Sequence, residues 1–196
     1  TSVAYELFKC NHANKAIDLL DVGIEHYPTD TVFYGVAAYM CKKTGRQGKA
    51  IELYEWSLAI DPLDILTILN LAYTYEEQNQ FEKARSLLLE SAGKQYIDKA
   101  MAFGILGNLN MKQNNIEEAE KCLLEAHRLE PLNMFNISSL ASIYTRQKRY
   151  DEARDLLYQS IKANPRDTVA LCMLGKIAVE QGHPEGAKSI YAACLK

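Results

Sequence analysis

An alanine recurs along the chain at almost constant intervals of 34, 34, 35, 34 and 34 residues. The six positions are Ala16, Ala50, Ala84, Ala119, Ala153 and Ala187. A large side chain follows each alanine four residues later, a small residue follows seven later, and an alanine or glycine stands twelve residues before it. Because spacings of three and four bring side chains onto one helix face, each period predicts two amphipathic helices. The small residues predict where these helices cross closely.

The segments between helices carry their own signals at the same period. Five residues before each alanine stand Asn11, Gly45, Asn79, Asn114, Lys148 and Gly182. Five of these six are Gly or Asn, which tolerate the left-handed backbone that ends a helix. The next junction carries Pro28, Pro62, Pro131 and Pro165 as helix stops, and Asp30, Asp64, Asp98, Asn133 and Asp167 as helix caps. The helix pairs are therefore expected in residues 1–30, 31–64, 65–99, 100–133, 134–167 and 168–196.

The stretch "KKTGRQGKA", residues 42–50, looks at first like part of a phosphate-binding loop. Such a loop needs G-x-x-x-x-G-K-[ST] between a strand and a helix. Here the two glycines are too close together, Ala50 replaces the hydroxyl residue, and a helix precedes the segment. We interpret it as the turn of the second repeat and predict no bound nucleotide or other cofactor.

A 34-residue helix pair with these positions resembles the tetratricopeptide repeat family. The motif is carried in residues 64–96 by Ile68, Leu71, Ala72, Tyr75, Ala84 and Leu88, and in the fourth repeat by Phe103, Leu106, Gly107, Ala119, Leu123 and Pro131. The resemblance implies an all-α, right-handed α-solenoid of 11–12 helices in one domain spanning residues 1–196. Tyr96 stands where proline is expected, and "SAGKQYIDK" holds one extra residue, so the third junction should be less regular.

The resemblance also implies that the first helix of each repeat lines a concave groove for a peptide or helix of a partner protein. The candidate groove residues are Tyr39, Lys42, Lys43, Leu69, Asn70, Tyr73, Glu76, Glu77, Asn108, Met111, Lys112, Ser142, Arg146 and Lys176. The family's carboxylate clamp for acidic chaperone tails is not matched, because Met101, Ile105 and Ser139 stand where polar or basic groups are expected. We therefore predict a protein partner that is not a chaperone tail.

Two further surfaces are candidates for contacts. Trp56 has mostly polar counterparts in the other repeats, so it is expected on the surface, either as a convex contact or lying over a neighbouring helix. No polar capping helix follows the last repeat, and Ile190, Tyr191 and Leu195 would face a stacking surface. This predicts either end-to-end self-association or further repeats, with the chain a fragment of a longer protein.

Composition excludes several other classes. The net charge of -3 offers no general attraction to nucleic acid or to anionic membranes, and no apolar run is long enough for a membrane span. The five cysteines form no C-x-x-C pair, which favours reduced thiols and a cytoplasmic or nuclear location. No metal-ligand spacing or catalytic constellation is present, so we predict a chain that is not an enzyme. The sequence "NIS" at Asn136 lies in an expected helix and is interpreted as a chance match to a glycosylation site.

Three functions remain open from the sequence. The first is a protein–protein interaction scaffold with a preformed groove. The second is a structural module that associates through its uncapped ends. The third, an RNA-binding helical repeat, is disfavoured because Glu76 and Glu77 fall in the expected groove and the chain is acidic.

Overall fold

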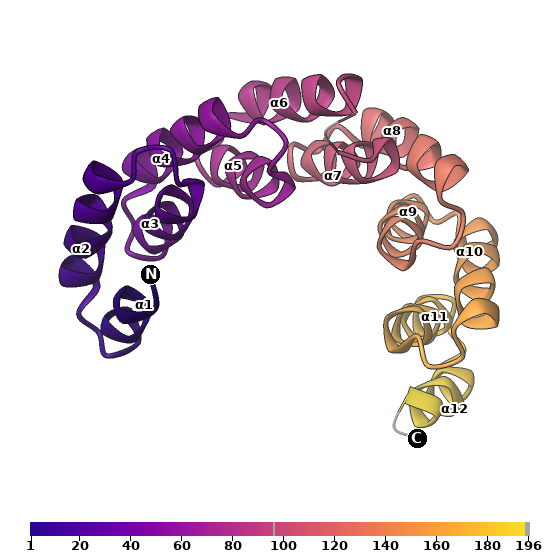
Figure 1. Ribbon diagram of the computed structural model, residues 1–196. Coiled ribbons are helices and arrows are strands. Elements are labelled where there is room, and N and C mark those ends of the chain that lie inside the picture. The colour runs from indigo at the N-terminus through magenta and orange to yellow at the C-terminus, as the bar shows by residue number, and fades with distance from the viewer. Residues whose placement is uncertain (96, 195–196) are drawn as a thin grey trace. The chain divides into compact units, whose positions relative to one another are not determined.

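The computed structural model describes residues 1–95 and 97–194, and within these residues it contains twelve α-helices and no strand (Figure 1). The helices are α1 (Ser2–Lys9), α2 (Ala13–His26), α3 (Thr31–Lys43), α4 (Gln47–Ile60), α5 (Ile65–Glu77), α6 (Phe81–Gly93), α7 (Lys99–Lys112), α8 (Ile116–Leu129), α9 (Met134–Arg146), α10 (Tyr150–Ala163), α11 (Thr168–Glu180) and α12 (Pro184–Cys194). The all-α fold class of paired helices is confirmed. Tyr96 and Leu195, to which the sequence drew attention, lie outside the described residues.

The helices form two compact units, Thr1–Asp98 and Lys99–Lys196, each built from three consecutive helix pairs. In each unit the odd-numbered helices lie on one side, the first-helix face, and the even-numbered helices on the other, the second-helix face (Figure 1). The division falls at the junction that carries the extra residue. A single domain across the whole chain stays a prediction.

The recurring alanines form the centre of each helix pair. All six are at most 2% exposed, and the large residue four positions later is fully buried in five repeats. The fit is close: a methyl group added to Gly107 on α7 would lie 2.5 Å from Cγ of Leu123 on α8. Small residues therefore let the two helices approach each other, as the repeat pattern predicts.

The predicted turn residues all adopt left-handed backbone. Positive φ is found at Asn11, Gly45, Asn79, Asn114, Lys148 and Gly182, and also at Gln95, which the pattern did not predict. Side-chain caps are equally regular: Asp30, Asp64, Asn133 and Asp167 each accept a backbone N–H in the first turn of the following helix. Local sequence signals therefore set both ends of most helices.

Lys148 is the turn residue least suited to its backbone, since its φ is 60°. Left-handed backbone costs a residue with a Cβ about 1–2 kcal/mol, and glycine avoids this cost. We expect Lys148→Gly to raise the free energy of unfolding by about 0.5–1 kcal/mol in urea titrations. The control is Lys121→Gly in the middle of α8, which should lower it by about 1 kcal/mol. A loss of stability in both variants would contradict this assignment of strain.

Candidate functional site

On the first-helix face of the first unit, aromatic side chains are only half covered. Tyr39 on α3 and Tyr73 on α5 occupy the same position of successive repeats and are 41% and 40% exposed. The Lys43 ammonium lies 5.5 Å from the centre of the Tyr39 ring. These rings are therefore available to a partner, with a cation beside one of them.

The charged residues of this face are already partly engaged. The Lys42 ammonium lies 3.1 Å from Oε1 of Glu77, an ion pair that joins α3 to α5, and only 17% of the Lys42 side chain is exposed. Lys42 therefore helps to hold the two helices together. Leu69 and Asn70, which were also predicted for this face, are partly buried.

Glu76, which was predicted for the groove, is largely buried. It is 8% exposed, which leaves its side chain little surface for a partner. Its neighbour Glu77 is exposed and remains on the surface.

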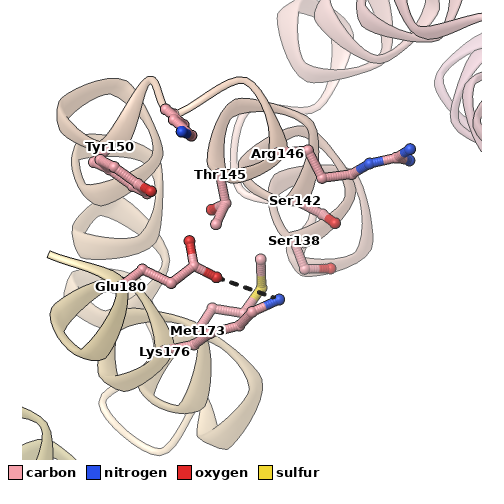
Figure 2. A pocket seen from close by; sticks show the side chains of 9 residues that line it. Ser138, Ser142, Thr145, Arg146, Tyr150, Met173, Lys176 and Glu180 are labelled. Carbon is pink, nitrogen blue, oxygen red and sulfur yellow. Dashed lines mark ion pairs between the residues drawn. The ribbon is translucent and has the colours of Figure 1, made fainter.

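In the second unit, an open pocket of about 490 Å³ lies between α9, the turn after α9, the start of α10, and α11 (Figure 2). Its walls carry hydroxyl, cationic and carboxylate groups and one thioether. The lining residues are Ser138, Ser142, Thr145, Arg146, Lys148, Tyr150, Met173, Lys176 and Glu180. The structure thus brings together the predicted Ser142, Arg146 and Lys176.

The charges of this pocket are weakly neutralised. Lys176 Nζ lies 3.8 Å from Oε1 of Glu180, at the limit of an ion pair, and 68% of the Lys176 side chain is exposed (Figure 2). The Arg146 guanidinium donates a hydrogen bond of 3.2 Å to Oδ1 of Asn114. Partial burial and the nearby Glu180 carboxylate raise the pKa of Tyr150.

Two predicted residues of α7 have structural roles instead. The Asn108 amide donates to the Gly104 carbonyl at 2.8 Å and accepts from the Ser139 hydroxyl at 3.1 Å. Met111 is partly buried and packs against the hydrophobic core of the second unit. Lys112, one residue later, is exposed.

Several pocket residues were missed by considering the first helices alone. Lys148 lies in the turn and Tyr150 begins the second helix, so neither belongs to the face that the repeat pattern singled out. The turn signal at Lys148 was available in the sequence, because that residue adopts the left-handed backbone after α9. Met173 and Glu180 differ from these two residues, because they lie on α11, which is itself a first helix.

The two other predicted contact surfaces, at Trp56 and on the last helix, differ in how much apolar side chain they expose. Trp56 is exposed on α4, with its indole edge-on to the Tyr34 ring at a centroid distance of 6.3 Å. On α12, Ile190 packs against the core of the second unit, which leaves it little free surface for self-association. Tyr191 is half exposed, with its ring close to Gly175. Self-association therefore has less exposed apolar surface in the described part of α12 than the sequence suggested.

Metal sites and membrane spans each require a particular grouping of residues. Over the described part of the chain, no three His, Cys, Asp or Glu side chains gather as they would to hold a metal ion. In the same residues, no helix has the length and apolar character needed to span a bilayer. Asn136, in the sequence "NIS", is 1% exposed, so its amide is inaccessible to glycosylation in the folded chain.

Family models described as tetratricopeptide repeat match residues 106–168 and 144–196. TPR repeat-containing protein PA4667 of Pseudomonas aeruginosa is 30% identical over 142 residues, which are 71% of this chain and 24% of that protein. Signal recognition particle subunit SRP72 of Homo sapiens is 23% identical over 174 residues, 84% of this chain and 25% of that protein. The chain spans about a quarter of the length of these curated relatives.

Solved structures share the fold at low sequence identity. Yeast Tom70 gives a TM-score of 0.75 at 17% identity, covering 92% of this chain and 39% of that one. YrrB, described as a TPR protein with an unusual peptide-binding site, gives a TM-score of 0.57 at 16% identity over 90% of each chain. The repeat pattern, the helix pairs and these matches together show that the chain belongs to the tetratricopeptide repeat family.

Proposed function

We propose that the chain is a non-catalytic scaffold that binds a segment of a partner protein on its first-helix faces. The observation that carries the proposal is the open pocket between α9 and α11. A preformed pocket on packed helices binds without a large ordering cost of its own. The family relationship supports the proposal, as does the peptide-binding site named for YrrB.

The pocket's charge indicates which side chain it accepts. Arg146, Lys148 and Lys176 line it together with a single carboxylate, that of Glu180. A partner carboxylate near Lys176 would gain a charge-assisted hydrogen bond and would face the Ser142 hydroxyl on α9. We therefore propose that the bound segment places an acidic side chain here.

An apolar surface continues from this pocket along α11. A second hollow of about 370 Å³ shares Lys176 and Met173 with the first, and is completed by Thr168, Val169 and Cys172. Its position suits an apolar side chain next to the acidic one. In the first unit, the half-exposed rings of Tyr39 and Tyr73 offer a comparable apolar surface.

Selection of peptides from a random-sequence display library on the purified chain tests the proposal. The selected peptides should combine acidic and apolar residues, and Lys176→Glu should weaken their binding at least about tenfold in fluorescence anisotropy, because attraction becomes repulsion. The matched control is Lys121→Glu on the second-helix face: Lys121 is 71% exposed and Lys176 68%, and each pairs with a glutamate of its own helix.

A second pair of variants examines the first unit. Peptides that bind there should lose affinity with Tyr73→Glu and keep it with Tyr158→Glu, an exposed tyrosine of α10. Circular dichroism of each variant verifies that the helices are intact. Failure to select any peptide, or equal loss in test and control variants, would contradict binding on the first-helix faces.

The described cysteines support a proposal about location. Cys10 and Cys41 are free thiols, and Cys10 is exposed. Exposed free thiols persist in a reducing compartment. We therefore place this scaffold in the cytoplasm or nucleus.

A further inference from the structure

A second kind of groove lies on the opposite, second-helix face of the first unit. It has a volume of about 450 Å³ and runs between α4 and α6, with α5 beneath it. Leu58, Leu71 and Leu87, one from each helix, supply apolar side chains to its lining. The Tyr75 ring of α5 also lines it. The groove is thus apolar at its base and belongs to a face that the proposed function does not use.

Elsewhere, side-chain pairs bridge neighbouring second helices. Lys49 Nζ on α4 lies 2.7 Å from Oδ2 of Asp21 on α2, and the Arg149 guanidinium lies 2.7 Å from Oε1 of Glu120 on α8. Arg149 directly precedes α10, so this pair closes the space between α8 and α10. Among the described residues, no hydrogen bond or ion pair joins α4 to α6, which leaves the groove open.

The repeat provides a direct comparison for the open groove. Tyr144 of the fifth repeat corresponds to Tyr75 of the third, and the Arg149 guanidinium covers its ring at 4.1 Å from the centroid. The residue that corresponds to Arg149 is Gln80, whose side chain carries no charge. No arginine of the chain therefore stands at this position beside Tyr75, although Tyr75 and Tyr144 are equally buried, each 6% exposed.

The charges around the groove suit a cation. Glu55, Glu82 and Glu90 line it, with Lys83 as the only cationic lining residue among those the structure describes. The Tyr75 hydroxyl donates to the Glu55 carboxylate, and the Lys83 ammonium lies 5.5 Å from the Tyr75 ring centre.

These carboxylates are not equally available to a partner. Glu90 pairs with Lys94 at 2.6 Å in an exposed contact, whereas Glu82 has no hydrogen bond or ion pair within the described residues. Exposed pairs of that kind are weak and exchange readily. Glu82 is therefore the carboxylate most available to an incoming cation.

We infer that this groove binds an arginine side chain of a partner protein, presented next to leucine-like residues. The guanidinium would lie beside Tyr75, in the place that Arg149 takes beside Tyr144, and would pair with Glu82 in the first turn of α6. Its aliphatic stem would lie along the leucine side chains. Arginine suits this site better than lysine because its planar group can stack and bind a carboxylate bidentately.

The probe is a short fluorescein-labelled peptide that alternates leucine and arginine, compared with a twin carrying citrulline, the neutral isostere of arginine. Fluorescence anisotropy should show the arginine peptide binding at least about tenfold more tightly. Glu82→Lys should weaken binding about tenfold. Gln80→Arg should weaken it similarly, because an arginine of the chain itself would then occupy the place of the partner's arginine. Gln80 directly precedes α6, as Arg149 precedes α10, so this variant is expected to fold.

The matched control is Glu117→Lys, which makes the same charge change at the equivalent first-turn position of α8. It should leave binding unchanged. Equal weakening by Glu82→Lys and Glu117→Lys would mean general attraction of a cationic peptide to an acidic chain and would overturn the inference. Equal binding of the arginine and citrulline peptides, or full binding by Gln80→Arg, would overturn it as well.

Discussion

Leu123→Ala is expected to lower the free energy of unfolding by about 3 kcal/mol, the largest single effect that we predict. Leu123 is fully buried on α8 and packs directly over Gly107 of α7. Truncation would leave a cavity at the crossing of the two helices, and the neighbouring helices are too tightly packed to fill it. Because each repeat is stabilised mainly by its neighbours, the loss should spread to the adjacent helix pair.

The neighbouring residue supplies the control for this substitution. Leu124 lies on the same helix but is exposed, so Leu124→Ala should change stability by less than about 0.5 kcal/mol. Urea titrations followed by circular dichroism give both values under the same conditions. Similar shifts of the two unfolding midpoints would show that this helix crossing does not stabilise the second unit.

The main features of the fold were predictable from the sequence because they depend on local rules. The spacing of alanines determines which side of each helix is buried, and turn and cap residues determine where helices end. Asp64 illustrates this: its side chain accepts from the backbone N–H groups of Leu66 and Thr67, as a capping residue should. Such signals act within a few residues and need no knowledge of distant contacts.

The candidate site was less predictable because it depends on contacts between neighbouring helices. Glu76 was assigned to the groove from the general position of α5, but the side chain is largely buried. Met111 and Ile190 carry apolar side chains that could lie on either surface, and both pack on the core of the second unit. Exposure at such border positions depends on helix rotation, which a repeat pattern determines only approximately.

The α9–α11 pocket shows a different limit. Its lining combines a first helix, a turn, the start of a second helix and the next first helix. Lys148 and Tyr150 enter it through the path of the chain after α9, not through a face of one helix. Sequence periodicity describes each helix separately, so a site shared by several segments is visible only when their packing is known.

The contact between Gly104 and Asn136 allows a test of how the packing of α7 against α9 depends on individual atoms. A methyl group added to Gly104 would lie 2.4 Å from Oδ1 of Asn136. Asn136 is 1% exposed, and its Nδ2 has no hydrogen-bond partner among the described residues. Gly104→Ala is therefore expected to cost about 2 kcal/mol, because the enclosed amide has little space in which to move.

Combining Gly104→Ala with Asn136→Ala should recover most of this loss, since the added methyl group then occupies space that the amide has left. The double variant should be about as stable as Asn136→Ala alone, which corresponds to a coupling energy of about 1–2 kcal/mol between the two positions. Gly35→Ala is the control: its methyl group would meet no atom within 4 Å, and alanine favours the helix. Strict additivity of the two substitutions in urea titrations would show that the helices separate to accommodate the methyl group, and the close α7–α9 contact would then not be a constraint on this sequence.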